Sequence, residues 1–182
     1  MRANVYVDGF NLYYGSLEGT PPGHKWLDLD ALARRLLPRD TVNRIRYFTA
    51  LITPRPGDDP KKVQRQQTYL RALDTIPNLS IHYGHFKTNK TRMKVVTPPP
   101  NTIEVYKTEE KGSDVNIATY MLLDAHNGDC DVAVVISNDS DLKEPVALAQ
   151  SDMGLKVGVV NPHPAVKRSL DLTPTFFKQL RA

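Results

Sequence analysis

The sequence predicts an α/β fold in which helices cover a mostly parallel central sheet. Segments that favour strands alternate with segments that favour helices along most of the 182 residues, and this alternation is typical of a parallel sheet. The stretches at 132–137 and 157–160 are nearly continuous in apolar residues, as expected for strands buried on both faces. With 40% hydrophobic residues, a chain of this length can form its own core, so we expect a single domain over residues 1–182.

The first half of the chain contains the first expected strands and helices. Residues 4–7 are apolar and stop at an Asp-Gly pair, which indicates a strand followed by a turn. Residues 26–37 have apolar side chains at helical spacing, and a second helix is expected after Asp58-Asp59-Pro60, where proline suits the first turn. Aromatic and β-branched residues at 44–53 and alternation at 79–87 indicate two further strands.

The segment that follows, residues 88–112, does not continue this alternation. Two stretches that favour strands, 92–97 and 102–107, flank Pro98-Pro99-Pro100. We expect a hairpin insertion on the surface near residues 88–110, with a rigid proline-rich tip. A flexible linker between two domains is the alternative.

The second half of the chain begins with a helix over residues 113–126 that ends at an Asn-Gly pair. Its expected apolar stripe is Val115, Ala118, Met121, Leu122 and Ala125. The expected elements after it are a strand at 132–137, a helix at 141–153 and a strand at 155–161. In the C-terminal tail, residues 165–182, we expect a loop and a short helix that contains Phe176 and Phe177.

Acidic side chains lie at the ends of elements that a parallel sheet brings together. Asp8 ends the first strand, Asp139 and Asp141 follow the strand at 132–137, and Asp114 begins a helix. Ligands bind such sheets outside the carboxyl ends of the strands, so we expect these acids to converge on one cleft if the two strands are neighbours. Clustered carboxylates repel each other unless a cation or protons neutralise them, and oxygen ligands suit Mg²⁺ or Mn²⁺.

Each acid also has a structural explanation of its own. Asp114 suits the first turn of a helix, and Asp8 before glycine suits a turn. Asp141 is expected to cap a helix, with Glu144 completing a capping box. These explanations account for single acids, but they do not account for acids from three separate segments at the same edge.

Three sequence blocks resemble the NYN domains, a branch of the PIN-like nucleases. They are "YVDGFNLYYG" at 6–15, "EKGSDVNIATYMLLDA" at 110–125 and "DVAVVISNDSDLKEPVALAQSDMGLKVGVV" at 131–160. The resemblance covers most of the chain and implies a three-layer, Rossmann-like (PIN-like) fold and metal-dependent cleavage of RNA. Two positions depart from the pattern of many members: Asn138 replaces a glycine, and Tyr120 replaces an acid.

The resemblance also implies roles for individual residues. Asp8, Asp114 and Asp139 would hold Mg²⁺ or Mn²⁺, and Asp141 would be a fourth ligand or orient the attacking water. Asn11 would form a hydrogen bond with a ligand or with the scissile phosphate. The function expected on this basis is an RNA-hydrolysing (endo)ribonuclease that uses a metal-activated water. The alternatives are a non-catalytic RNA-binding or adaptor module of the same fold and a structure-specific DNA nuclease.

Basic and aromatic residues near the expected hairpin favour single-stranded RNA as the partner. The candidates are Lys87, Lys90, Arg92, Lys94, Lys107, Lys111, Tyr13 and Tyr14. A solvated hairpin beside ordinary core tyrosines is the alternative interpretation.

The composition is compatible with a polyanionic partner and an intracellular setting. The net charge is +4 and the pI is about 9.1, which permits nucleic-acid binding without requiring it. The single cysteine, Cys130, excludes a disulfide framework and favours a reducing, cytoplasmic location. We expect neither a signal peptide nor a membrane span, and a homodimer or an inhibitory or adaptor partner remains open.

Overall fold

A six-stranded parallel sheet forms the centre of the molecule. In the computed structural model, residues 1–54, 57–163 and 172–180 are described. The strands are β1 (Arg2–Asp8), β2 (Thr41–Thr49), β3 (Leu79–Tyr83), β6 (Val132–Ile136), β7 (Lys156–Asn161) and β8 (Phe176–Gln179). Their order is β3-β2-β1-β6-β7-β8, and every neighbouring pair is parallel. This arrangement confirms the predicted α/β fold.

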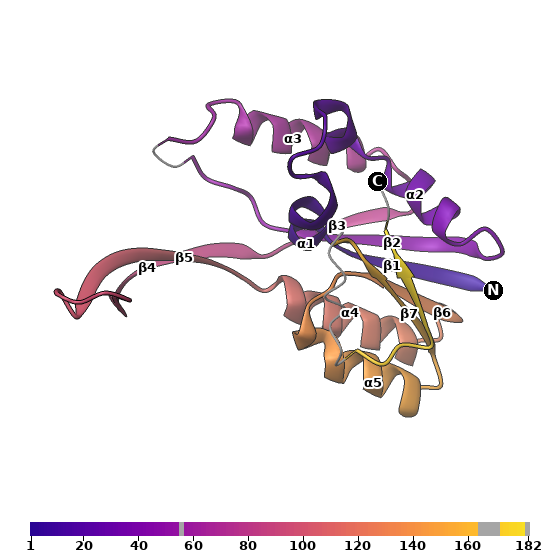
Figure 1. Ribbon diagram of the computed structural model, residues 1–182. Helices are drawn as coiled ribbons and strands as arrows, with labels where there is room; N and C mark the ends of the chain where they lie inside the picture. The colour runs from indigo at the N-terminus through magenta and orange to yellow at the C-terminus, as the bar shows by residue number, and fades with distance from the viewer. Residues whose placement is uncertain (55–56, 164–171, 181–182) are drawn as a thin grey trace.

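Helices cover both faces of the sheet and complete three layers (Figure 1). The α-helices are α1 (Gly9–Leu12), α2 (Leu29–Leu36), α3 (Lys62–Leu73), α4 (Ser113–His126) and α5 (Lys143–Ser151). Shorter helical turns lie at Tyr13–Leu17, Pro22–Trp26 and Ser140–Leu142. α1, α2 and α3 lie on one face, and α4 and α5 lie on the other (Figure 1). No helix in the described ranges is long and apolar enough to cross a membrane.

Strand β1 is buried on both faces because its side chains alternate between the two helical layers. Val5 and Val7 belong to the apolar core beneath α2 and α3, whereas Tyr6 belongs to the core beneath α4 and α5. Asp8 therefore continues the α4 side of the strand.

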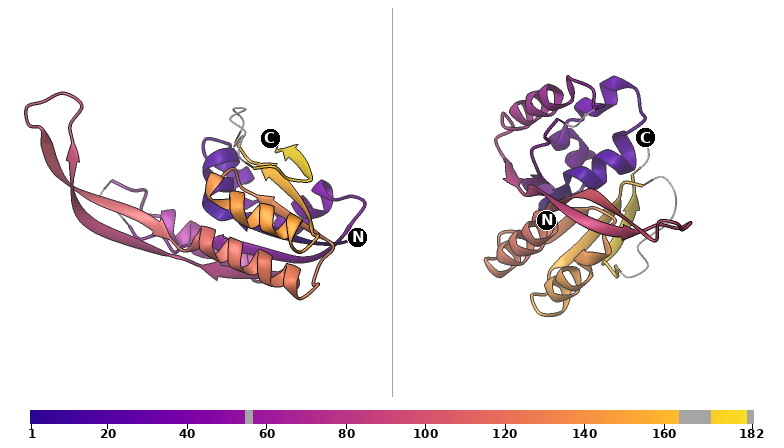
Figure 2. Two further views of the ribbon diagram at one scale, coloured as in Figure 1. Left: turned by 90° about the horizontal axis from the view of Figure 1, so that it is seen from below. Right: turned by 90° about the vertical axis from the view of Figure 1, so that its left-hand side faces the viewer.

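The segment predicted as a surface hairpin forms one, and it is longer than expected. Strands β4 (His85–Lys94) and β5 (Thr102–Lys111) pair in antiparallel fashion and make no part of the central sheet. The ribbon projects far from the body of the molecule (Figures 1 and 2). The single strand expected at 79–87 is divided at Gly84 between β3 and this hairpin.

The expected helix containing Phe176 and Phe177 is wrong, because these residues begin strand β8 at the edge of the sheet. Phe176 lies opposite Gly158 of β7, where a glycine leaves room for its ring. This cross-strand packing outweighs local helical preference. The other residues of the predicted tail, 165–171 and 181–182, lie outside the described residues.

The apolar stripe predicted for α4 is also wrong in part. Val115 is 68% exposed, whereas Ile117, Met121 and the acidic Asp124 are buried. An acid takes a core position because Arg46 of β2 neutralises it, with an N–O distance of 2.6 Å. Apolar periodicity could not reveal a helix face that is partly charged.

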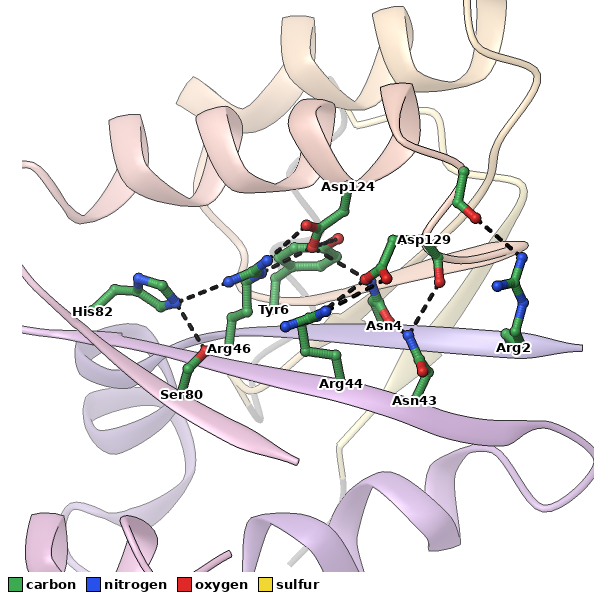
Figure 3. Close-up of polar contacts among 11 residues, drawn as sticks. Arg2, Asn4, Tyr6, Asn43, Arg44, Arg46, Ser80, His82, Asp124 and Asp129 are labelled. Atoms are coloured by element: carbon green, nitrogen blue, oxygen red, sulfur yellow. Dashed lines mark hydrogen bonds and ion pairs between the residues drawn. The ribbon is translucent and has the colours of Figure 1, made fainter. Parts of the chain in front are cut away.

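A buried polar network around Asp124 attaches α4 to the sheet (Figure 3). Arg46 donates two hydrogen bonds to the Asp124 carboxylate, of 2.8 and 2.6 Å, and the Tyr6 hydroxyl donates a third of 2.8 Å. The Tyr120 ring lies against Arg46, whose guanidinium carbon is 4.6 Å from the ring centroid. The network fixes the helix that begins beside Asp114.

Candidate functional site

The candidate site lies where the sheet order reverses, at the carboxyl ends of β1 and β6. Val7 of β1 is in register with Ile136 of β6, so Asp8 and Ser137 leave the sheet side by side. Connections from these two neighbouring strands run to opposite faces of the sheet (Figure 1). Open parallel sheets bind ligands at such crossover points.

Asp8 is a buried carboxylate that the protein holds in a fixed position. It is 6% exposed. Its two oxygens accept hydrogen bonds from the Asn11 backbone N–H, at 3.0 Å, and from Ser137 Oγ, at 2.9 Å. Burial raises the pKa of Asp8, these hydrogen bonds partly oppose the shift, and the charge of Asp139 adds to it.

Gly9 permits this geometry because the chain after Asp8 passes directly over the end of β2. A Cβ atom at Gly9 would lie 2.7 Å from the Phe48 carbonyl oxygen and 2.7 Å from the Tyr47 hydroxyl. The predicted turn chemistry therefore has a packing cause: only glycine lets helix α1 begin against β2.

Asn11 connects α1 to the loop after β6. Its Oδ1 accepts a hydrogen bond from the Asn138 backbone N–H, at 3.0 Å, and lies 3.2 Å from His163 Nε2. The side-chain oxygen of Asn11 is thus engaged in contacts within the protein. His163, which follows β7, did not enter the predicted site, and no spacing signal in the sequence connects it to Asn11.

Asp139, rather than Asp141, caps the short helix that follows β6. Asp139 Oδ1 accepts a hydrogen bond from the Asp141 backbone N–H, at 2.9 Å, and the Asp139 N–H donates to Ser137 Oγ, at 3.1 Å. The structural alternative, in which Asp141 is the cap, is therefore wrong, because the capping residue lies two positions earlier. The Asp141 residue is exposed.

Asp114 completes the cluster from the opposite side, at the start of α4. Burial raises its pKa to about 6, and the charges of Asp8, Asp139, Glu110 and Asp141 add to this shift in that order. The acids predicted from the sequence thus act on one another electrostatically at one edge of the sheet.

Glu110 is a further acid at this edge that was not among the predicted residues. It is the last residue but one of β5 and accepts hydrogen bonds from the Ser113 backbone N–H, at 3.3 Å, and from the Ser113 hydroxyl, at 3.0 Å. It therefore fixes the first turn of α4 and raises the pKa of both Asp8 and Asp114. Its only sequence signal is its place in the second block, just before the helix.

The chemistry of these side chains fits a hard divalent cation. Within residues 1–54, 57–163 and 172–180, no three His, Cys, Asp or Glu side chains already lie close enough together to hold a metal ion. The donors at this edge are carboxylate oxygens, which suit Mg²⁺, an ion that binds proteins through one or two carboxylates and keeps several waters. The side chains present are therefore compatible with such an ion.

The predicted basic residues divide between the two faces of the hairpin. Lys90, Arg92 and Lys94 alternate with the other residues of β4 and share one face. Lys87 lies opposite Glu109, and on that second face Glu109 also binds Lys107 and Lys111, at 2.5 and 3.3 Å. The structure thus brings only half of the predicted set onto one surface.

The first face of the hairpin also carries aromatic side chains. Tyr106 lies opposite Lys90, whose Nζ is 5.5 Å from the tyrosine ring centroid. At the base of the same face, the Phe86 ring contacts Phe10, with centroids 5.6 Å apart. The predicted Tyr13 and Tyr14 line a cavity beside α1, and Tyr14 stacks on Phe10, with centroids 6.4 Å apart.

A parallel sheet between two helical layers, with acids at its crossover edge, is consistent with a domain of the PIN-like class. Residues 2–177 match the NYN domain family. The chain therefore belongs to the NYN domain family, whose members are in general nucleases.

Two further comparisons place the chain among known proteins. It is 33% identical to the 6-hydroxy-3-succinoylpyridine 3-monooxygenase HspA of Pseudomonas putida (strain DSM 28022 / S16), over 93% of this chain and 62% of that protein. The chain thus spans less than two thirds of this relative. The structure resembles that of a protein of unknown function, VPA0982, from Vibrio parahaemolyticus RIMD 2210633. The TM-score is 0.59 at 16% identity, over 99% of this chain and 93% of that one, and this likeness concerns the fold alone.

Proposed function

We propose that this protein is a metal-dependent ribonuclease that hydrolyses phosphodiester bonds of single-stranded RNA with water. The main support is the convergence of Asp8, Asp114, Asp139 and Asp141 on the crossover edge, where burial and neighbouring acids raise the pKa of Asp114 to about 6. Asp8, Asp114 and Asp139 would hold Mg²⁺ or Mn²⁺ directly or through bound water, with Asp141 as a further ligand or a water-orienting group. The bound ion would supply charge stabilisation at the phosphate and a more acidic water.

The chain's own residues position this site. The Asn11 backbone and Ser137 fix both oxygens of Asp8, so the carboxylate needs no reorganisation on binding. Glu110 orients the first turn of α4 and thereby Asp114. Burial and the neighbouring acids raise the pKa of Asp114 to about 6, and a cation beside these acids would relieve their repulsion.

The decisive experiment is cleavage of a labelled single-stranded RNA with Mn²⁺, and with Mn²⁺ plus EDTA. We expect chelation to abolish cleavage and the Asp139→Asn/Asp141→Asn variant to lose at least about 100-fold in rate. The Asp74→Asn/Asp152→Asn variant, which removes two exposed acids from other helix ends, should retain full activity.

Other outcomes of this experiment identify the alternatives. RNA binding without cleavage, with or without metal, would make the protein an RNA-binding or adaptor module. Equal cleavage of DNA and RNA strands of the same sequence would indicate a general nuclease, because the metal chemistry does not require the 2′-hydroxyl.

We assign RNA binding to the hairpin face that carries Lys90, Arg92 and Lys94. This face begins at Phe86 and Glu110, beside the acids, and continues outward past Tyr106, so a strand bound there would reach the site. Glu104 lies opposite Arg92 and lowers the positive charge of the face. The logarithm of the RNA-binding constant falls linearly with the logarithm of the salt concentration, by about 0.7 for each phosphate contact of a single strand. Replacing the three basic residues by Gln should therefore make this slope shallower by about 2.

The second hairpin face provides a matched control with the same change in charge. Replacing Lys87, Lys107 and Lys111 by Gln should change the slope much less, since Glu109 already binds two of these lysines. Equal slopes for the two triple variants would show that the protein binds RNA elsewhere.

A second candidate function follows from the Pseudomonas putida relative. That protein is named as a monooxygenase of 6-hydroxy-3-succinoylpyridine, and this chain has a cavity of about 400 Å³ rich in aromatic side chains. Such a cavity suits a small aromatic acid. Saturable binding and consumption of this pyridine, without binding of RNA, would favour this function over the ribonuclease.

A further inference from the structure

A cavity of about 400 Å³ lies between α1, the turn at Pro22–Trp26 and α3, on the face of the sheet opposite to α4 (Figure 1). This volume is within the range of small-ligand sites. The neutral, planar surfaces that line it come from Phe10, Tyr13, Tyr14, Trp26, Tyr47 and Tyr69.

The aromatic walls are held in place by packing and hydrogen bonds. Tyr69 packs edge-on against Trp26 and Tyr47, with centroids 6.3 Å apart in both pairs. The Tyr69 hydroxyl donates to the Leu27 carbonyl oxygen, at 2.8 Å. Tyr14, in contrast, is 54% exposed at the rim, where its ring can cover a ligand.

Lys25 supplies a positive charge at this rim. Two other basic residues of the lining are engaged with acids: Arg65 binds Asp59 at 2.8 Å, and Lys62 binds Asp58 at 3.5 Å. Lys25 makes no ion pair within the described ranges, and its Nζ lies 5.7 Å from the Tyr13 ring centroid. It is therefore the cation most available to a ligand anion.

The cavity and the acid cluster share one short segment. Gly9, which lines the cavity, directly follows Asp8, and the absence of a side chain there lets the Tyr47 ring approach. A polymer that places a phosphate beside Asp8 therefore has an aromatic cavity within reach of its next unit.

We propose that this cavity binds the base of an RNA nucleotide adjacent to the scissile phosphate, with Lys25 against the phosphate of that nucleotide. This inference rests on the proposed ribonuclease function and assigns a base-binding subsite to it. Stacking on aromatic side chains is the main way in which proteins hold unpaired bases, and it tolerates different bases. The subsite would favour single strands, since a paired base cannot enter a cavity.

The single tryptophan of the chain, Trp26, allows a direct test, because it lines the cavity. Its fluorescence should change saturably on titration with AMP or UMP in EDTA, where no cleavage occurs. Tyr14→Ala should weaken this binding by roughly 5- to 100-fold, the range that corresponds to the loss of one stacking contact. Lys25→Ala should weaken it by roughly 10- to 100-fold, because it removes a charged contact with the phosphate.

Matched controls are Tyr83→Ala and Lys143→Ala, which remove an exposed tyrosine and an exposed lysine outside the cavity and outside the hairpin face assigned to RNA. Both should bind the mononucleotides as the wild type does. Equal weakening in the controls, no saturable response to either nucleotide, or a response only to a small aromatic acid such as 6-hydroxynicotinate would overturn the proposal.

Failure of this inference is distinguishable from failure of the proposed function. If Mn²⁺-dependent cleavage is intact and its KM is unchanged in Tyr14→Ala and Lys25→Ala, the subsite is wrong and the ribonuclease stands. If Trp26 reports nucleotide binding but RNA is never cut, the subsite stands and the ribonuclease is wrong.

Discussion

Replacing Asp114 by Asn should make the metal-free protein more stable at alkaline pH, although it removes a residue of the proposed site. The folded state raises the pKa of Asp114 to about 6, first through burial and then through the acids around it. The unfolded chain would have the ordinary value of about 3.9. The folded state therefore binds this proton more tightly than the unfolded state does.

The sign and the size of the effect follow from this difference. Between about pH 4 and pH 6 the unfolded state releases this proton first, so the free energy of unfolding falls as the pH rises. Above the folded pKa, the ionised Asp114 destabilises the folded state to the full extent. A shift of about two pKa units corresponds to roughly 3 kcal/mol. Asp114 is partly exposed, and water reduces the cost, so we expect a gain of about 1–3 kcal/mol for the Asn variant near pH 8.

Urea unfolding in EDTA, near pH 8 and near pH 5, measures this prediction. The gain from Asp114→Asn should be about half as large near pH 5, where much of the carboxylate is still protonated in the folded state. Asp59→Asn is the matched control, because Lys61 and Arg65 lower the pKa of this surface carboxyl group and its removal should bring no gain. Equal or lower stability of Asp114→Asn near pH 8, or a gain that does not depend on pH, would refute the repulsion argument.

Two further predictions concern the core that supports the site. Arg46→Met should lower the free energy of unfolding by about 3–5 kcal/mol in the same assay, because it leaves the buried Asp124 carboxylate without its partner. Arg34→Met, at an exposed ion pair, should cost about 0.5 kcal/mol or less, and similar losses in the two variants would contradict the role of burial. Gly158→Ala should cost about 1–3 kcal/mol in thermal unfolding, since its Cβ would lie 2.1 Å from the Phe176 ring, and an unchanged Tm would show that the ring can move without cost.

Much of the fold could be predicted because its strands and helices follow local patterns. The continuous apolar run at 132–137 and the alternating helices indicate a covered parallel sheet, and the structure has one. Phe176 could not be placed in this way, because its conformation depends on a glycine in another strand. The buried side of α4 was equally hidden, since Asp124 is acceptable in the core only beside Arg46.

The acids of the candidate site could be predicted for a topological reason. Each lies where a strand ends or a helix begins, and a parallel sheet brings such positions to one edge. Glu110 and His163 could not be found in this way. Glu110 lies at this edge because β5 pairs with β4 in a particular register, and His163 lies there because it contacts Asn11. No local sequence pattern encodes either contact.

Helix α4 shows how a fold can hold acids together that repel each other. At its first turn, burial raises the pKa of Asp114, and the charges of Asp8 and Asp139 add to this shift. Asp124, ten residues later and about 15 Å along the axis, is bound by Arg46 and Tyr6 in the core. Because both residues belong to one rigid helix, the contacts that fix Asp124 also fix the position of Asp114. The buried ion pair therefore opposes the repulsion at the site, and loosening it should let Asp114 withdraw from Asp8 and return its pKa toward the ordinary value.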